Sequence, residues 1–485
     1  MKKTPTPYSR YFETPRCEGN YQPVTERLRH FGEFRIPLTS PAISEQGNRC
    51  MTCGIPFCHN AGCPLGNPIP EANALVRDNR WKEASDLFHA YNNFPEFTGR
   101  LCPALCEASC VHYINDDAVT IRQIELEIVE RAWREGWIKP SVPQTKTGKR
   151  VAVIGSGPAG LAAAQQLARA GYDVVLYEKD DLPGGILRYG IPDFKLEKSV
   201  LDRRLEQMQA EGVSFETNVK IGEDVSPLYL KRQFDAVVLT GGAMEPRNLD
   251  VPGREAKGIY FAMDYLMASN YAVRENRRST IDADGLKVIT LGGGDTGADC
   301  LGTALRQGAS SVLQLEIMPK PPEGKNEATP WPRWPVISRT GTSHKEGGDR
   351  RWNVSTKRFL TEKGRVIGIE GIEVDWSTGK PVEKPGTEFK QPADIVLLAL
   401  GFVHPKQDAL LEMLGVELDA RKNVKVNPET MMTSVPGIFS AGDMQSGASL
   451  VVRCIAGGRQ AAYNVDKYLT GSSNLPKIEP TPSWR

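Results

Sequence analysis

The chain has 485 residues, of which 40% are apolar and 25% are charged, a composition typical of globular proteins with room for about three domains. Its 60 basic and 59 acidic residues leave a formal net charge of +1, so the overall charge gives no reason to expect nucleic acid or an anionic membrane surface as a partner. The N-terminal stretch lacks the apolar core of a signal peptide, and no run is long and apolar enough to span a bilayer. We therefore expect a cytoplasmic protein without nucleic-acid or membrane partners, in which close cysteines serve metals or redox chemistry more often than disulfides.

The first 145 residues form a cysteine-rich unit that ends in KPSVPQTKTGKR, whose composition is typical of a linker. No strand pattern stands out in this unit, so we predict helices and loops. Residues 116–136 begin with acidic residues and then carry apolar residues three or four positions apart, which predicts a helix. Seven of the ten cysteines of the chain gather in this unit: Cys50, Cys53, Cys58, Cys63, Cys102, Cys106 and Cys110.

Residues 150–179 and 287–316 repeat one pattern of strand, glycine turn, helix and strand. Glycines in such a turn let the backbone approach a dinucleotide pyrophosphate at the start of the helix. In the first copy Glu178 ends the second strand, where a carboxylate accepts hydrogen bonds from ribose hydroxyls. This context favours a dinucleotide site over a purely structural turn. The turn glycines of the first copy are Gly155, Gly157 and Gly160.

The second copy ends in Glu316, in the position that corresponds to Glu178. A carboxylate there binds a free ribose 2′-hydroxyl and repels a 2′-phosphate, which favours NADH over NADPH, although a solvated strand end is the alternative. The turn glycines of the second copy are Gly292, Gly294 and Gly297. Four basic residues further along are candidates to contact a phosphate instead: Lys320, Arg339, Arg350 and Arg351.

Three further apolar runs, residues 234–243, 393–402 and 436–443, predict strands that are buried on both faces of an α/β sheet. The last run delivers Gly442 and Asp443 to the start of a glycine-flanked helix, a position suited to the ribityl or pyrophosphate region of a flavin. The proline-rich residues 320–341 predict a long surface loop within the second dinucleotide domain.

The clustered cysteines allow three interpretations: iron–sulfur clusters, structural zinc and free thiols. Two dinucleotide sites suggest a nicotinamide that gives a hydride to a bound flavin, and a flavin can release electrons singly to a nearby iron–sulfur cluster. Zinc has no use in such a path, so clusters are favoured. Two 4Fe-4S clusters need eight ligands, one more than the seven cysteines supply. Glu125 is the candidate for the eighth because it lies close to the apolar face of its helix, although an ion pair with Arg122 would also explain it.

These motifs together resemble the small (beta) subunit of glutamate synthase, and the similarity runs nearly from end to end. Its most specific stretches are NDDAVTIRQIE and the N-terminal arm YFETPRCEGNYQPVTERLRHFGEF. Other stretches, such as CMTCGIPFCHNAGCPLGN and GRLCPALCEASC, are shared with a wider group of reductases that includes dihydropyrimidine dehydrogenase. In place of LEIMPKPPEGKNEATPWPRWP many bacterial members have a tyrosine and two arginines, so this form is more similar to that of the NADH-using enzymes.

The resemblance implies a multidomain α/β fold, in which a helical iron–sulfur domain precedes two Rossmann-like domains and the second of these is inserted in the first. The expected bounds are residues 1–145 for two 4Fe-4S clusters, 146–254 with 402–485 for FAD, and 255–401 for NAD(P)H. It also implies that residues 183–192, with Gly185, lie against the flavin. One cluster would be held by Cys50, Cys53, Cys58 and Cys110, and the other by Cys63, Cys102, Cys106 and Glu125.

The implied function is the electron-input subunit of glutamate synthase, which passes electrons from NAD(P)H to the large (alpha) subunit that makes glutamate from glutamine and 2-oxoglutarate. Hydride transfer needs positioning of two rings and no acid–base residue, so we name no catalytic residue. One alternative is an NAD(P)H-dependent reductase that serves ferredoxin or a pyrimidine-reducing partner. Another is a cofactor-bearing assembly module. Cys17, Cys300 and Cys454 receive no role.

Overall fold

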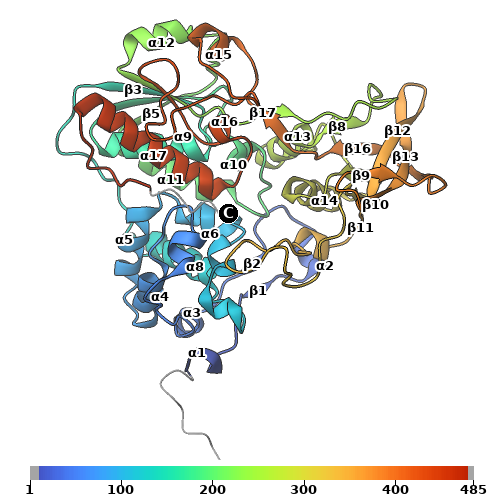
Figure 1. Ribbon diagram of the computed structural model, residues 1–485, viewed down its shortest axis with the longest axis horizontal. Helices are drawn as coiled ribbons and strands as arrows, with labels where there is room; N and C mark the ends of the chain where they lie inside the picture. The colour runs from blue at the N-terminus through green and yellow to red at the C-terminus, as the bar shows by residue number, and fades with distance from the viewer. Residues whose placement is uncertain (1–9, 479–485) are drawn as a thin grey trace, which may run out of the picture.

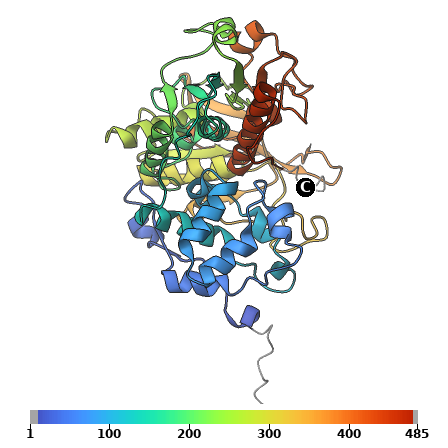
Figure 2. The same ribbon diagram turned by 90° about the vertical axis from the view of Figure 1, so that its left-hand side faces the viewer.

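The computed structural model describes residues 10–478. A helical domain lies below two α/β units, and the colour order of the chain runs from that domain into the first unit, out to the second and back (Figure 1). Figure 2, turned by a quarter, shows the same helical domain beneath both units. The multidomain α/β fold with one Rossmann-like unit inserted in the other is thereby confirmed, while the boundaries expected for each domain remain predictions.

The helical domain has the architecture that its sequence predicts, apart from one short ladder. The predicted helix over 116–136 is present as α8, and the apolar residues on one of its faces, including Ile124 and Ile128, are fully buried. Strands β1 (Asn20–Tyr21) and β2 (Arg35–Ile36) form an antiparallel pair too short to leave a sequence pattern. The helices are α1 (Arg10–Glu13), α2 (Val24–Arg27), α3 (Ser40–Gly47), α4 (Ile69–Arg77), α5 (Trp81–Tyr91), α6 (Pro95–Leu101), α7 (Leu105–Ala108) and α8 (Ile121–Arg134), with a π-helix, η1 (Cys58–Gly62), and a 3-10 helix, η2 (Val111–Ile114).

The first α/β unit is a five-stranded parallel sheet in the order β18-β6-β3-β4-β5. Its last strand, β18, comes from the far side of the inserted unit, so both chain segments share one hydrophobic core. The strands are β3 (Arg150–Ile154), β4 (Asp173–Tyr177), β5 (Val213–Glu216), β6 (Ala236–Leu239) and β18 (Ile438–Ser440). The helices are α9 (Pro158–Arg169), α10 (Ile186–Tyr189), α11 (Lys198–Ala210), α12 (Pro227–Gln233), α15 (Ala409–Leu414), α16 (Asp443–Ser446) and α17 (Val451–Thr470).

The second α/β unit has its own five-stranded parallel sheet in the order β11-β10-β9-β16-β8. The three strands predicted at residues 234–243, 393–402 and 436–443 are β6, β16 and β18, and all three are buried throughout. The parallel strands of this unit are β8 (Ile259–Phe261), β9 (Lys287–Leu291), β10 (Ser311–Leu315), β11 (Asp349–Arg351) and β16 (Ile395–Leu398), and its helices are α13 (Ala262–Arg274), α14 (Asp295–Gln307) and the 3-10 helix η3 (Ser343–Lys345).

An antiparallel sheet that the sequence did not predict extends the second unit on the right of Figure 1. It is built on a long hairpin, β12 (Val354–Glu362) with β13 (Arg365–Asp375), to which β14 (Val382–Glu383) and β15 (Phe389–Pro392) add. Strands β7 (Glu245–Pro246) and β17 (Phe402–His404) pair where the chain leaves the first unit and returns to it. The two connections between the units therefore run side by side.

Buried polar contacts join the helical domain to the first α/β unit. The Nε atom of Arg204 lies 2.6 Å from a carboxylate oxygen of Glu96, and both side chains are fully buried. Beside them, burial and the Arg204 guanidinium lower the pKa of His89 to about 4. Asn93 donates to the side chain of Gln165 on α9 at 2.7 Å. The helical domain is thus fixed against the helix that follows the first glycine turn.

A second set of buried polar contacts joins the N-terminal arm to the inserted unit. The carboxylate of Glu346 lies 2.7 Å from Arg306 of α14 and 3.0 Å from Arg27 of α2, and none of these three side chains is more than 4% exposed. The Arg306 guanidinium also lies 3.9 Å from the ring centre of Phe194, which belongs to the first unit. All three parts of the chain meet at this point.

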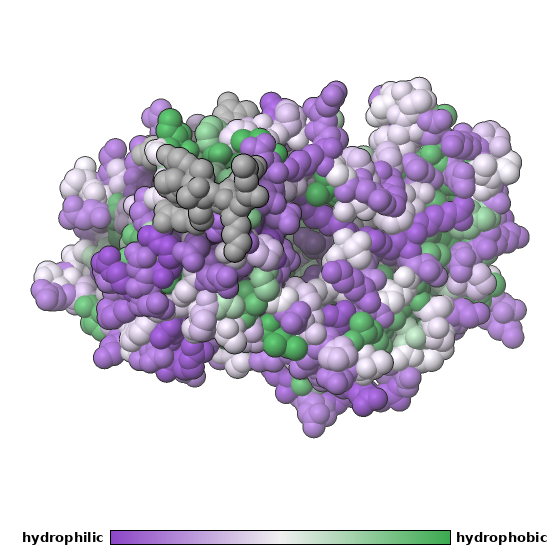
Figure 3. All heavy atoms as spheres, turned by 90° about the horizontal axis from the view of Figure 1, so that it is seen from below, coloured by the Kyte–Doolittle hydropathy of each residue, from purple (hydrophilic) through white to green (hydrophobic). Residues whose placement is uncertain are grey.

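No helix among residues 10–478 is long and apolar enough to cross a membrane. On the face that Figure 3 shows, apolar residues form small patches between hydrophilic ones and no continuous band over the described residues.

Candidate cofactor sites

The first glycine turn connects β3 to α9 in a shape that only glycine permits. A Cβ atom on Gly160 would lie 1.9 Å from the carbonyl oxygen of Gly155, and Gly155 itself has a φ of +96°. Space is open in front of Gly157, where an added Cβ would meet nothing within 4 Å. The start of α9 therefore presents its backbone N–H groups to an open face, the arrangement that suits a pyrophosphate.

Glu178 is tied to this turn at the end of β4. Its carboxylate accepts the backbone N–H of Ser156 at 3.1 Å and that of Asp180 at 3.0 Å, and the residue is 4% exposed. The sequence predicted a carboxylate at this strand end, and the structure places it against the second residue of the glycine turn. It is well positioned to accept ribose hydroxyls of a dinucleotide.

Two more segments predicted to contact a flavin converge on the same helix start. A Cβ on Gly185, whose φ is +52°, would lie 3.0 Å from Cα of Gly157. A Cβ on Gly442, whose φ is +68°, would lie 2.7 Å from Cβ of Ala159, the second residue of α9. Asp443 follows Gly442, so the residues expected to hold FAD surround one open face, and they fit that group.

Asp443 is held by donors that reach one oxygen of its carboxylate. Oδ1 accepts the backbone N–H and the hydroxyl of Ser449, each at 2.9 Å, and the thiol of Cys454 at 3.0 Å. Burial raises the pKa of Asp443. Since the hydrogen bonds of the described residues all reach Oδ1, Oδ2 is left to accept from a ligand.

The second glycine turn, between β9 and α14, reproduces the first. A Cβ on Gly297 would lie 2.3 Å from the carbonyl oxygen of Gly292, and Gly294 faces open space. Glu316 accepts the backbone N–H of Gly293 at 2.5 Å and that of Met318 at 2.9 Å. This is the same pair of contacts that Glu178 makes, so the turn and its carboxylate fit a second dinucleotide.

The four basic residues beyond Glu316 have other contacts in this structure. Arg351 lies 2.9 Å from Glu373, and Lys320 lies 2.9 Å from Glu323. Arg350 donates to the carbonyl of Arg339 at 3.2 Å. Arg351 is therefore held toward the antiparallel sheet, whereas the side chain of Arg350 is held by the backbone carbonyl of Arg339.

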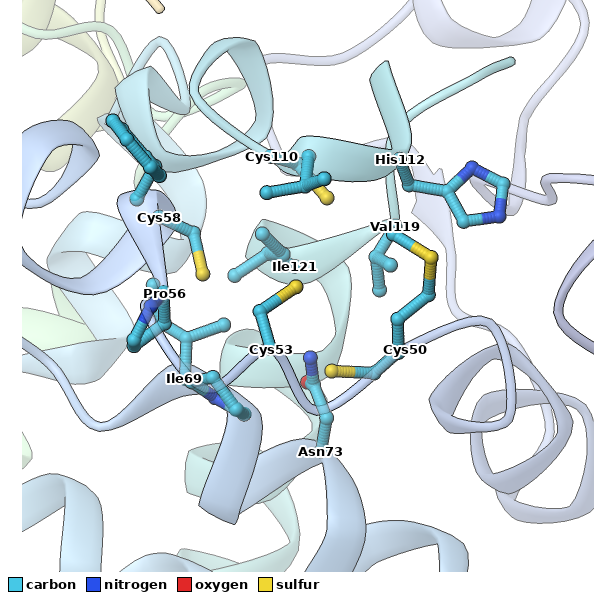
Figure 4. Close-up of a pocket in the computed structure, with 14 residues that line it drawn as sticks. Cys50, Cys53, Pro56, Cys58, Ile69, Asn73, Cys110, His112, Val119 and Ile121 are labelled. Atoms are coloured by element: carbon cyan, nitrogen blue, oxygen red, sulfur yellow. The ribbon is translucent and has the colours of Figure 1, made fainter. Parts of the chain in front are cut away.

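Four cysteines of the helical domain line one pocket, and Figure 4 shows their sulfur atoms facing it. Cys53 is the most exposed of the four, and the other three are buried. Burial is the main cause of the raised pKa of each thiol, and for Cys58 the neighbouring thiols add to it. The members of this first cysteine group are Cys50, Cys53, Cys58 and Cys110.

A second group of four side chains lies in the same domain. Burial raises the pKa of Cys63 to about 12 and that of Cys102 to about 11, and the nearby Glu125 carboxylate adds to both effects. Burial also raises the pKa of Cys106, and the neighbouring Cys102, Cys63 and Glu125 add to this effect. The structure thus brings Cys63, Cys102, Cys106 and Glu125 together, which is the set that the family resemblance implied.

Glu125 is buried, and it faces this group from α8. Its Oε1 accepts the side-chain amide of Asn92 at 3.1 Å and the hydroxyl of Thr98. Burial raises its pKa to about 7 in spite of these hydrogen bonds. The alternative partner, Arg122, instead donates to the carbonyl of Cys102 at 3.1 Å and makes no ion pair with Glu125 among the described residues.

Two glycines that the sequence analysis passed over allow this grouping. A Cβ on Gly62 would lie 2.6 Å from Cα of Cys106, and one on Gly99 would lie 2.8 Å from Cβ of Leu126. The first lets η1 press against α7, and the second lets α6 press against α8. A glycine inside an otherwise helical segment is the signal that could have pointed to such close approaches.

No three His, Cys, Asp or Glu side chains of residues 10–478 are placed to hold a single metal ion. The first set of four cysteines lines one pocket, and thiolates are the ligands by which proteins hold a 4Fe-4S cluster, so these residues fit that group. His59 belongs to neither set, because its Nδ1 lies 2.8 Å from the carbonyl of Asn67. Cys17 is exposed, and Cys300 is fully buried in α14.

Comparison with known proteins gives two family matches. Residues 149–458 match the pyridine nucleotide-disulphide oxidoreductases, and residues 27–137 match the 4Fe-4S domain II of dihydropyrimidine dehydrogenase. Among solved structures, FprA from Mycobacterium tuberculosis is similar in fold, with a TM-score of 0.54 and 19% identity over 67% of this chain and 85% of that chain.

Curated relatives match over nearly the whole length. The glutamate synthase (NADPH) small chain of Mycobacterium tuberculosis is 52% identical, and 95% of each chain is covered. That of Bacillus subtilis is 42% identical over 94% of this chain and 96% of the relative. The glutamate synthase (NADH) of Schizosaccharomyces pombe is 44% identical over 96% of this chain but only 23% of its own length.

Proposed function

The chain belongs to the glutamate synthase small chains, and from that premise we propose that it is the electron-input subunit of a glutamate synthase. In this role it oxidises NAD(P)H and delivers electrons to a large subunit that makes L-glutamate from L-glutamine and 2-oxoglutarate. The relative from Schizosaccharomyces pombe supports this pairing, because there the matching segment is about a quarter of one longer glutamate synthase chain. We place this function in the cytoplasm.

The main support for the proposal is that buried contacts join the two dinucleotide turns to two groups of four candidate ligands. The first turn would hold FAD and the second NAD(P)H, a pair that supplies hydride transfer, and the two ligand groups would hold 4Fe-4S clusters, which supply one-electron transfer. The residues of the chain supply the frame: Glu178 and Asp443 fix the first nucleotide, and Glu316 fixes the second.

The position of the second ligand group supports its place next to the flavin. Asn92 donates to Glu125, and the adjacent Asn93 donates to Gln165 of α9, the helix that begins at the first glycine turn. No described contact of this kind joins the first cysteine group to α9, and each group has one partly exposed cysteine, Cys53 or Cys102. We propose that electrons pass from the flavin to the second group, then to the first, and then to the large subunit.

We also propose that NADH is the preferred coenzyme. Glu316 is anchored by two backbone N–H groups beside the second turn, so its charge stays where the ribose 2′ position is expected. Glu316→Ala should lower the ratio of kcat/KM for NADH to that for NADPH, and an unchanged ratio would remove the basis for this preference. Glu362→Ala, which removes an exposed carboxylate at the end of β12 in the same unit, serves as the matched control.

The isolated holoprotein provides the first test of the function. Under anaerobic conditions NADH should bleach both flavin and cluster absorbance, and glutamine with 2-oxoglutarate should yield no glutamate without the large subunit. If the coenzyme reduces the flavin but the clusters stay oxidised, the assembly-module alternative gains support and the proposed electron path is wrong.

A further inference from the structure

The proline-rich residues 320–341, here called the bridging loop, form a self-supported structure. They contain no helix or strand, as the sequence predicted. The backbone N–H of Ser338 donates to the carbonyl of Pro322 at 2.7 Å, which brings the two ends of the loop together. The side chain of Asn326 donates to the carbonyl of Val336 at 3.0 Å. Long ordered loops of this kind inside a compact domain are usually functional.

The sequence analysis expected this loop to lie within the second dinucleotide domain. Its tip instead contacts the helical domain. Trp331 donates its indole N–H to the backbone carbonyl of Cys110 at 3.2 Å. Ser109 returns a hydrogen bond from its hydroxyl to the carbonyl of Pro332 at 3.0 Å. The Trp331 ring also packs on Phe57, with 4.8 Å between ring centres.

These contacts place the tip directly behind the first cysteine group. Phe57 precedes Cys58 and lines the same pocket as the four cysteines, so Trp331 covers the outer side of one of its walls. A second anchor lies nearby, where the ammonium of Lys325 is 3.9 Å from the ring centre of Tyr113. A segment of the inserted unit thus packs against one wall of a site in the helical domain.

We propose that Trp331 is a positioning residue for electron transfer, which shields the first cysteine group from water and thereby sets the redox potential of the cluster held there. The inference rests on the proposed function, because that function assigns a 4Fe-4S cluster to this group. Accepting one electron adds negative charge without making or breaking a bond, and water stabilises added charge more than a protein wall does. Removing the shield should therefore make reduction easier.

The test uses the anaerobically prepared holoprotein in three forms besides the parent: Trp331→Ala, Trp331→Phe and Trp334→Phe. Trp334 is the matched control, because it lies in the same loop, stacks under Arg339 at 4.0 Å and does not line the pocket of the four cysteines. Redox titration followed by electron paramagnetic resonance measures the midpoint of each cluster. The rate at which cluster absorbance bleaches in air measures access of solvent and oxygen.

We expect Trp331→Ala to shift the first-cluster midpoint to a more positive potential and to raise the bleaching rate several-fold. Trp331→Phe should shift the midpoint in the same direction but less, since it keeps a ring on Phe57 and leaves a smaller gap for water than alanine does. The second cluster, the flavin and the Trp334→Phe variant should match the parent.

Parental midpoints and bleaching rates in Trp331→Ala would overturn the inference. If that variant does not assemble, Trp331→Phe decides, and parental values in it overturn the inference as well. A parent protein without clusters after preparation would instead contradict the proposed function itself, so the two failures are distinguishable.

Discussion

Replacement of Glu125 by alanine should remove the cluster proposed for the second group, whereas replacement by glutamine should keep both clusters. Glu125 is 6% exposed and is the only non-cysteine member of the second group. The hydrogen bonds that it accepts from described residues, from Asn92 and Thr98, all reach Oε1, which leaves Oε2 to face the three cysteines. Glutamine can turn its one amide oxygen toward the metal while its NH2 group donates to the Thr98 hydroxyl oxygen, whereas alanine supplies no ligand.

The size of the effect follows from the buried donors. Asn92 keeps its hydrogen bond to Thr98 at 2.8 Å, and Thr98 keeps the carbonyl of Phe94 at 3.3 Å, so each lost hydrogen bond costs about 0.5–1.5 kcal/mol and the contact with α8 weakens by about 1–3 kcal/mol. The same change reduces the second group to three ligands. Both losses act on the segment that carries Cys102, so partial retention of the cluster is not expected.

The assay is the iron and acid-labile sulfide content per chain, with electron paramagnetic resonance of the reduced protein. Glu125→Ala should contain half the iron of the parent and show one cluster signal, and Glu125→Gln should match the parent. Glu135→Ala is the matched control, since Glu135 lies at the end of the same helix with a side chain that is 45% exposed. Full iron content and two unchanged signals in Glu125→Ala would refute the assignment of this ligand.

Three further changes test the frame around the sites. Gly160→Ala should abolish FAD retention, measured by absorbance after gel filtration, because its Cβ would lie 1.9 Å from the carbonyl of Gly155; Gly324→Ala, with open space around it, should retain FAD. Glu346→Gln leaves two buried arginines without their shared charge and should destabilise the fold by about 3–5 kcal/mol, seen as a clear drop in melting temperature; an unchanged melting temperature would contradict this. The pKa of His89 is lowered to about 4 in the folded state, so the unfolded state binds a proton first and stability falls as the pH drops below about 6.5. Between about pH 7.5 and about pH 5.5 this loss amounts to about 1.4 kcal/mol, and His89→Gln should make the pH dependence of the melting temperature shallower; an equal dependence in both proteins would show that another group is responsible.

The local parts of the sites were predictable from the sequence, and the long-range parts were not. Both glycine turns and the placement of Glu178 and Glu316 follow from strand, turn and helix that are adjacent in the chain. The division of the cysteines into two groups followed from the family resemblance alone, because it depends on Gly62 and Gly99 letting separate helices approach closely. Spacing along the chain does not encode that contact.

The bridging loop shows the same limit. Its proline content correctly predicted the lack of regular structure, but no local pattern indicated that Trp331 would pack behind Cys110, more than two hundred positions earlier in the chain. The hairpin of β12 and β13 was also missed, because its residues show no alternation of apolar and polar side chains strong enough to distinguish strands from a loop.

The most direct test of the account is glutamate formation from glutamine and 2-oxoglutarate under anaerobic conditions, with NADH or NADPH, by this chain with and without the candidate large subunit. The account predicts glutamate only when both chains are present, at a higher rate with NADH. Brisk coenzyme oxidation with an artificial acceptor, but no glutamate with a large subunit shown to be competent by other means, would contradict the proposed partnership.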